Sequence, residues 1–244
     1  MEITIVIVII AFASVSIFKL NYITSKIDIK LDDDPYISSH AKYQAALLLL
    51  SFVVLLLTYL QEPDNFKLLF SMGNISAAVR PVRWLGIEEG ESWIFTGLYF
   101  SIIITLGTFA FIYIQYKKSK VPLKEVFPYF IWIVAFSLTN SFSEEAIYRL
   151  GVISPLYGVI DTSELILLSA ILFGLVHFGG MPNGIIGMLM AGFLGWFLAK
   201  SIVETEGIFW AWLIHFIQDI VIYIGFILGN ISSNQAIKND QQKS

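Results

Sequence analysis

The sequence lacks cysteine and has few charged residues. Without cysteine, the chain has no disulfide bond, no thiolate nucleophile, no cysteine-ligated metal and no cysteine-linked lipid. Charged residues make up 14% of its 244 residues, whereas an average soluble domain has about 25%. The net charge is only −4, and no cluster of lysine and arginine has the pattern of a nucleic-acid site, so we expect no nucleic-acid partner.

Apolar residues dominate instead. They make up 57% of the chain, and the mean hydropathy is +0.75. A membrane-spanning helix needs about 20 mostly apolar residues. Seven apolar runs are candidate spans, namely 3–18, 43–60, 92–116, 126–150, 165–178, 183–199 and 207–228. The first, fifth and sixth runs are short, so the sequence predicts about seven spans within a range of six to eight.

These runs favour helices over barrel strands. A barrel strand alternates between lipid-facing and lumen-facing residues, whereas these runs are apolar on every side. A helix also satisfies its backbone groups internally, as lipid requires. The sequence therefore predicts an all-α, multi-pass membrane bundle. Within one membrane domain, we expect N-terminal helices and loops over 1–125, a functional core over 126–228 formed by the last four helices, and a polar tail over 229–244.

Basic residues predict an orientation. Loops rich in lysine and arginine face the cytoplasm. This rule places two loops inside the cell, because they contain most of the lysines: Lys19, Lys26, Lys30, Lys42, Lys117, Lys118, Lys120 and Lys124. With seven spans, the N-terminus would lie outside and the C-terminus, with Lys238 and Lys243, inside. In the loop after the second span, PVRWLG at 81–86 predicts an interfacial helix anchored by Trp84.

Several ionisable residues lie in or beside the later apolar runs. A charge at the bilayer centre costs about 2.5–3.5 kcal/mol on insertion scales, so such groups usually face the protein interior and have a function. Three predicted helices contain them: Glu144, Glu145, Arg149, His177, His215 and Asp219. A metal centre formed from this set would use Glu144, His177, His215 and Asp219.

The spacing within SFSEEAIYRLG separates its two glutamates. Glu145 and Arg149 are four residues apart and can form an ion pair on one helical face. Glu144 lies about 100° further round the helix and has no such partner. An uncompensated carboxylate in a buried site is a candidate general base. The structural alternative is a helix end at the membrane boundary, with Ser143 as a cap.

The histidines also have two interpretations each. His177 ends an apolar run and, taken alone, is typical of an interfacial or packing residue. His215 and Asp219 are four residues apart, so the carboxylate can accept the imidazole N–H and fix its tautomer. That pair can equally be a structural contact, although Asp219 has no basic partner in its own helix. We expect His40, in a polar segment, to be solvated.

Glycines in the later spans have a packing interpretation. Gly174, Gly187, Gly192 and Gly195 are small residues that let membrane helices approach closely.

Carboxylates and histidines on three helices can activate water. A glutamate can act directly as the base, or zinc held by histidine and carboxylate can lower the pKa of a bound water to about 7. No serine stands beside a histidine in a pattern that indicates a nucleophilic mechanism.

Three motifs occur in order along successive spans: EEAIYR, FGLVH and HFIQD. Together they resemble the EExxxR, FxxxH and Hxxx(N/D) motifs of the CPBP family, also called the Abi or type II CAAX prenyl endopeptidase family. The resemblance implies a glutamate-dependent intramembrane peptidase. By position, Glu144 and His177 would activate water, and Glu145 and Arg149 would hold the site. His215 and Asp219 would stabilise the oxyanion.

The sequence departs from the family pattern at two positions. Leu150 stands between Arg149 and Gly151, where relatives often have glycine directly after the arginine. Asp219 occupies a position where an asparagine could donate to an oxyanion, and an ionised aspartate cannot donate. Asp219 would have to be protonated, orient His215 or bind a metal. The resemblance leaves metal-free and zinc-dependent mechanisms both open.

The expected substrate is a small peptide or a membrane-associated protein, including a prenylated one, within the lipid bilayer. Short loops and small size are typical of bacterial members, which are linked to bacteriocin immunity or peptide processing, so a bacterial cell membrane is the expected location. Two alternatives are a non-catalytic immunity or scaffold protein and a proton-coupled transporter. The transporter is less favoured, because the sequence has no inverted repeat. The oligomeric state is left open.

Overall fold

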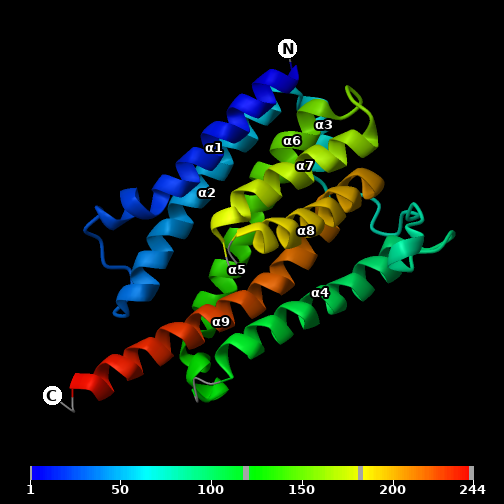
Figure 1. Ribbon diagram of the computed structural model, residues 1–244. Coiled ribbons are helices and arrows are strands. Elements are labelled where there is room, and N and C mark those ends of the chain that lie inside the picture. Colours follow the sequence, from blue (N-terminus) through cyan, green and yellow to red (C-terminus); the bar gives the residue numbers. More distant parts are fainter. Residues whose placement is uncertain (1, 118–120, 181–183, 242–244) are drawn as a thin grey trace.

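The computed structural model describes residues 2–117, 121–180 and 184–241, and the described chain is almost entirely helical (Figure 1). Within these described ranges, seven helical segments are long and apolar enough to cross a membrane, which confirms the prediction of an all-α bundle with about seven spans. The elements in order are α1 (Glu2–Ser25), α2 (Pro35–Gln61), α3 (Pro63–Leu69), η1 (Arg83–Leu85), α4 (Trp93–Tyr116), η2 (Leu123–Tyr129), α5 (Phe130–Glu145), η3 (Ala146–Leu150), α6 (Gly151–Leu156), α7 (Thr162–Val176), η4 (His177–Gly179), α8 (Gly184–Thr205) and α9 (Phe209–Gln241).

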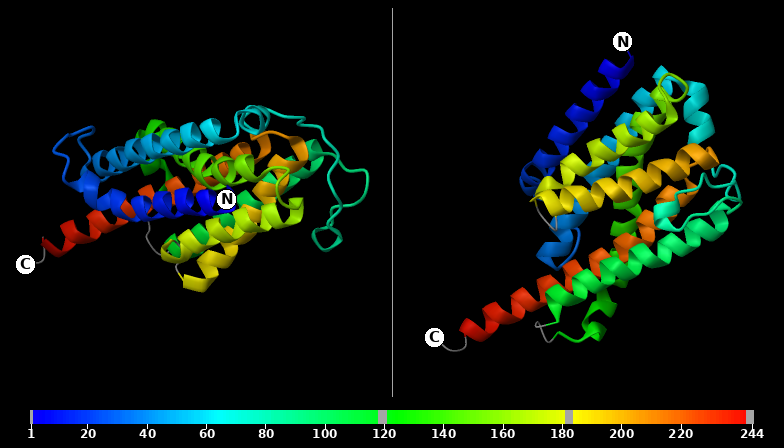
Figure 2. Two further views of the ribbon diagram at one scale, coloured as in Figure 1. Left: turned by 90° about the horizontal axis from the view of Figure 1, so that it is seen from above. Right: turned by 45° about the vertical axis from the view of Figure 1, so that its right-hand side comes forward.

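The bundle is organised around α5 and α9. Helix α5 packs against α2 and α9, while α7 and α8 form a hairpin and α1 packs on α2. Helix α4 runs beside α9 along one edge of the molecule (Figures 1 and 2). The N-terminus lies at one end of the bundle and the C-terminus at the other (Figure 1). The loop between α1 and α2 lies at the C-terminal end, so the basic residues Lys26 and Lys30 share that end. Lys118, Lys120 and Lys243 lie outside the described residues, and the orientation in the bilayer stays a prediction.

Local capping explains where two helices begin. Asp34 precedes α2 and accepts hydrogen bonds from the backbone N–H groups of Tyr36 and Ile37, and Pro35 occupies the first helical position. Asp161 caps α7 in the same way, accepting from the N–H of Ser163 at 2.8 Å. This hydrogen bond lowers the pKa of the exposed Asp161 carboxyl. Aspartate at such positions satisfies backbone donors that have no partner inside the helix.

Two local predictions need correction. The polar tail predicted over 229–244 is helical as far as Gln241, because the residues after Gly229 include no proline or glycine that would end α9. PVRWLG forms only the three-residue 3₁₀ helix η1 instead of an interfacial helix. Pro81 cannot donate a backbone hydrogen bond, and Gly86, at φ 74°, ends the turn in the left-handed region.

A buried ion pair on α8 fixes the loop before α4. Lys200 and Glu204 pair one turn apart, and both side chains are almost fully buried. The Glu204 carboxylate also accepts from the backbone N–H of Arg80 and the indole N–H of Trp93, at 3.2 and 3.0 Å. Lys200 donates to the carbonyl of Arg80 at 3.0 Å. These charges belong to a structural contact that the sequence analysis did not identify.

Glycines bring α7 and α8 into close contact, as predicted. A Cβ atom on Gly174 would lie 2.8 Å from the carbonyl oxygen of Met188 and 3.2 Å from the Cα of Gly192. A Cβ on Gly195 would meet the ring of Phe173 at 3.1 Å. The α7–α8 hairpin therefore depends on small residues, and it positions the end of α7, where His177 lies.

We predict that Gly174→Ala lowers the free energy of unfolding by about 1–3 kcal/mol, because the added methyl group meets a backbone oxygen that cannot move away cheaply. Denaturant titration in detergent micelles measures this change. Gly107→Ala in α4 is the matched control, since no atom lies within 4 Å of its added Cβ. Equal stability of the two variants would contradict the close-packing interpretation.

Candidate active site

The first site segment is a helix interrupted by a π-helical turn. Glu144 and Glu145 end α5, Arg149 lies in the π-helix η3, and α6 follows without a break. The N–H of Gly151 donates to the carbonyl of Ala146, five residues earlier. Such π turns are rare and are frequent at functional sites. The extra residue in the turn changes the faces that α5 and α6 present to their neighbours.

A fully buried chain of charges lies at the centre of the site. The Oε2 atom of Glu145 is 3.3 Å from Nε of Arg149, which confirms the predicted ion pair. Its Oε1 atom is 2.8 Å from Nδ1 of His215 on α9. The ring of Phe173 lies 3.9 Å from the guanidinium carbon of Arg149, a cation–π contact. Glu145 thus links two turns of the α5–η3 segment to α9.

Glu144 faces the two histidines. Its Oε2 atom is 3.5 Å from Nε2 of His215 and 3.9 Å from Nε2 of His177. Both separations exceed a direct hydrogen bond, which is about 2.7–3.2 Å. The side chains of Glu144 and His177 are 18% and 31% exposed, so they form the accessible side of the site. Glu144 is therefore the carboxylate that a substrate can reach.

The position of His177 is fixed by its own helix. It follows α7 directly, and its Nδ1 atom is 2.8 Å from the carbonyl oxygen of Phe173. That carbonyl can only accept, so Nδ1 bears the proton of this hydrogen bond. Nε2 is left to face Glu144.

Asp219 has a second partner that the sequence analysis missed. Its Oδ1 atom is 3.7 Å from Nε2 of His215, and its Oδ2 atom accepts from Nδ2 of Asn140 at 3.1 Å. The spacing allows Asp219 to accept from the imidazole, but its 3.7 Å separation from Nε2 exceeds a hydrogen bond, and Glu145 contacts the other ring nitrogen, Nδ1, at 2.8 Å. The signal for Asn140 was its place one turn before Glu144 in an apolar run.

All six predicted residues therefore come together from three segments of the chain. Glu144, Glu145 and Arg149 come from the α5–η3 segment, His177 from the end of α7, and the pair on α9 completes the set. The cluster offers one accessible carboxylate, two imidazoles facing it and a buried support. Such an arrangement can remove a proton from water and hold a developing negative charge.

Glu144, His177, His215 and Asp219 were the residues predicted to hold a metal ion. Among the described residues, no group of three or more His, Asp or Glu side chains is arranged to hold a metal ion. The four proposed ligands as placed therefore do not fit a metal, and no step below depends on one.

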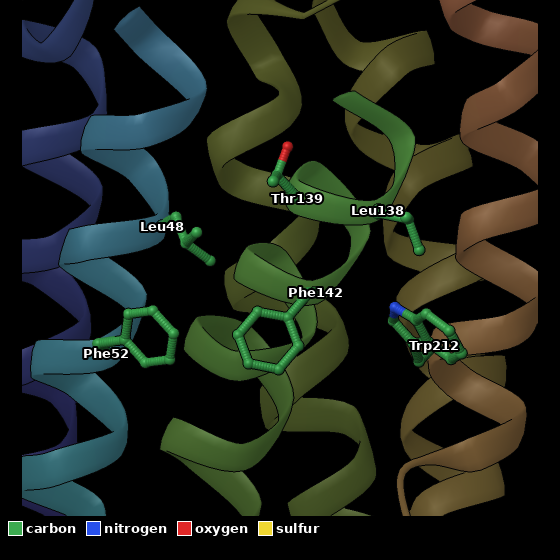
Figure 3. A pocket seen from close by; sticks show the side chains of 6 residues that line it. All are labelled: Leu48, Phe52, Leu138, Thr139, Phe142 and Trp212. Atoms are coloured by element: carbon green, nitrogen blue, oxygen red, sulfur yellow. The ribbon is translucent and has the colours of Figure 1, made fainter. Parts of the chain in front are cut away.

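An apolar pocket is lined in part by residues of α5 and α9, which also contain site residues (Figure 3). Phe142 in its wall is three residues before Glu145, and Trp212 is three residues before His215. The pocket lies between α2, α5 and α9 and is lined by Leu48, Phe52, Leu138, Thr139, Phe142 and Trp212. Apolar groups of a membrane-embedded molecule can therefore lie within a turn of the site residues.

Comparison with known proteins supports the resemblance. Residues 126–221 match the family model described as type II CAAX prenyl endopeptidase Rce1-like. No curated protein and no solved structure matches the chain. The match begins at the first residue of the predicted core and includes all six site residues. Residues 126–221 are therefore similar to the Rce1-like family, in a chain whose described residues include seven helical segments long and apolar enough to cross a membrane.

We predict that Arg149→Met alone lowers the free energy of unfolding by about 3–5 kcal/mol, because it leaves the buried Glu145 carboxylate without its cation. The double variant Glu145→Gln/Arg149→Met should recover most of this loss, since glutamine still accepts from His215 Nδ1. Unfolding in mixed micelles measures both. Wild-type stability in Arg149→Met would show that the ion pair is not required.

Proposed function

We propose that the protein is an intramembrane endopeptidase that hydrolyses a peptide bond with water activated by Glu144 and His177. The observation that carries this proposal is the position of the Glu144 carboxylate. It lies between two imidazole nitrogens, on the accessible side of a cluster whose other charges are buried and paired. The protease family of the Rce1-like core supports the same reaction class.

In the first step, a water bound between Glu144 and His177 attacks the scissile carbonyl carbon. Glu144 takes one proton from this water as the new C–O bond forms and the carbonyl oxygen becomes an oxyanion. His177 orients the water through Nε2, because Nδ1 is already committed to Phe173. General-base assistance of this kind typically contributes about 10²–10⁴-fold to the rate.

The oxyanion needs a donor, which we assign to His215. Three carboxylate groups surround its ring: Glu145 at Nδ1, and Glu144 and Asp219 at Nε2. With both nitrogens protonated, His215 donates to Glu145 and directs Nε2–H toward the reacting atoms. Asp219 remains an acceptor and holds the imidazole. In this proposal an aspartate can therefore occupy the motif position where an asparagine would donate.

In the second step, the C–N bond breaks and the oxyanion collapses to a carboxylic acid. The proton that Glu144 took from water passes to the departing amine nitrogen, which restores the carboxylate of Glu144. Atoms and charges balance with water as the only co-reactant. Glu145 and Arg149 take no part in proton transfer. They hold the α5–η3 segment against α9.

We further propose a membrane-associated substrate. The site lies among helices that cross the membrane, and the adjoining apolar pocket suits an apolar side chain or an attached lipid such as a prenyl group. The name of the matching family, type II CAAX prenyl endopeptidase, agrees with this proposal. A peptide or lipid-modified protein reaching the site from the bilayer is therefore the expected partner, with lipids covering the remaining apolar surface.

We predict that Glu144→Gln lowers the cleavage rate about 10²–10⁴-fold with the fold retained, because the amide cannot accept the proton from water. His177→Ala should also lose cleavage. The assay follows a fluorogenic peptide, with and without a prenyl group, cleaved by purified protein in lipid nanodiscs. Glu164→Gln is the control, since this exposed carboxylate lies in the first turn of α7. Undiminished cleavage by the Glu144→Gln variant would overturn the mechanism. If the wild-type protein binds the peptide but does not cleave it, the protein is non-catalytic.

We also predict that cleavage persists after the enzyme is treated with a chelator, because the site residues as placed do not form a metal centre. Activity is compared before treatment, after dialysis against EDTA and 1,10-phenanthroline, and after zinc is added back. Loss of activity that zinc restores would show that the site rearranges around a metal.

A further inference from the structure

A buried hydrogen-bond network connects the site to α2. Nε2 of Gln44 donates to Oδ1 of Asn140 at 3.3 Å and to the hydroxyl of Tyr223 at 2.7 Å. Asn140 in turn donates to Asp219 at 3.1 Å. Gln44, Tyr223 and Asp219 are each less than 5% exposed. We call these four residues, Gln44, Asn140, Asp219 and Tyr223, the Asn140 network.

The network also corrects the expectation for His40. This residue lies within α2, where its Nε2 atom is 3.3 Å from the hydroxyl of Tyr223 and its ring packs edge-on to Phe136. His40 is therefore half-buried at the far end of the network and is not a solvated loop residue.

The chemistry of the groups fixes the direction of the hydrogen bonds. An ionised carboxylate only accepts, so Asn140 turns its NH₂ group toward Asp219. The carbonyl oxygen of Asn140 then faces the NH₂ group of Gln44, as observed. Every contact in this part of the network has one donor and one acceptor. A satisfied buried network of this kind holds its members in one arrangement.

The arrangement determines how Asp219 meets His215. Asn140 occupies Oδ2, so the other oxygen, Oδ1, faces the imidazole at 3.7 Å. Nε2 of the same ring faces Glu144 at 3.5 Å. Without Asn140, the Asp219 carboxylate would lose its neutral donor in a site where it is 2% exposed. It could then rotate away from His215 to find another partner.

We propose that Asn140 is a positioning residue for the hydrolysis: it holds the Asp219 carboxylate against His215, and Gln44 holds Asn140. This inference rests on the proposed function for the reaction that it serves. It adds a residue outside the three motifs and gives α2, which lies outside the matched segment, a part in the site.

The first test is kinetic. Asn140→Leu and Asn140→Asp should lower kcat roughly 10- to 100-fold and change KM less than about twofold, because they misplace a group near the chemistry without touching the substrate. Ser137→Ala is the matched control, since its buried hydroxyl on the same helix bonds only to a backbone carbonyl one turn earlier. Wild-type kcat in both Asn140 variants would overturn the proposal.

An exchange of the two side chains provides a sharper test. In Asn140→Asp two carboxylates face each other, and in Asp219→Asn two amides do. The double variant Asn140→Asp/Asp219→Asn restores one donor and one acceptor across the same contact. We expect its kcat to exceed that of Asn140→Asp at least tenfold. Additive losses would show that the two residues act independently.

A measurement without turnover separates this inference from the proposed function. The chain has three histidines, so ¹⁵N-histidine NMR can follow His215 once Glu144→Gln and His215→Gln spectra assign it. We expect the Nε2 signal of His215 to shift in Asn140→Leu and to stay unchanged in Ser137→Ala. An unmoved signal in Asn140→Leu would reject the positioning role. A shifted signal in a protein that cleaves nothing would support positioning and reject the peptidase.

Discussion

The site depends on one carboxylate that contacts two basic side chains. One carboxylate oxygen of Glu145 lies 3.3 Å from Nε of Arg149 as an ion pair, the other faces His215, and all three side chains are at most 5% exposed. A guanidinium removed from water costs several kcal/mol unless a partner and hydrogen bonds compensate. The carboxylate of Glu145 provides that partner, and Phe173 covers the guanidinium face. Because the contact joins the α5–η3 segment to α9, the helix packing and the charge balance depend on the same contact.

Helical geometry places the adjacent side chains of Glu144 and Glu145 in different surroundings. Successive residues of a helix point about 100° apart, so the side chain before Glu145 cannot share its buried position. Glu144 is turned toward the histidines at the accessible side and has no cation of its own as close as Arg149 is to Glu145. Arg149, in the π turn that follows, lies 3.3 Å from Glu145. The fold thus separates a buried, paired carboxylate from an accessible one within two residues.

The sequence was enough to predict the helices, the Glu145–Arg149 pair and the convergence of three motifs, because hydrophobic length and i, i+4 spacing are local properties. It could not reveal contacts that depend on how helices pack. The bond from Glu145 to His215 spans 70 residues, and those from Asn140 to Asp219 and to Gln44 span 79 and 96. Local patterns also failed at η1 and at the end of α9, where single prolines and glycines, or their absence, decided the structure. His40 was misjudged for the same reason, since its partner Tyr223 lies on α9.

The charge balance of the cluster explains why it suits proton transfer. The cluster contains three carboxylates, those of Glu144, Glu145 and Asp219, and one permanent cation, Arg149. Two negative charges therefore remain, in a region where unbalanced charge is costly. Two protons, placed on the histidines or on the carboxylates, would neutralise them, and so would one divalent cation. Among the described residues, no group of three or more His, Asp or Glu side chains is arranged to hold a metal ion, which favours protons. A cluster whose charge is balanced by protons can release and take them up during a reaction, which is what the proposed hydrolysis requires.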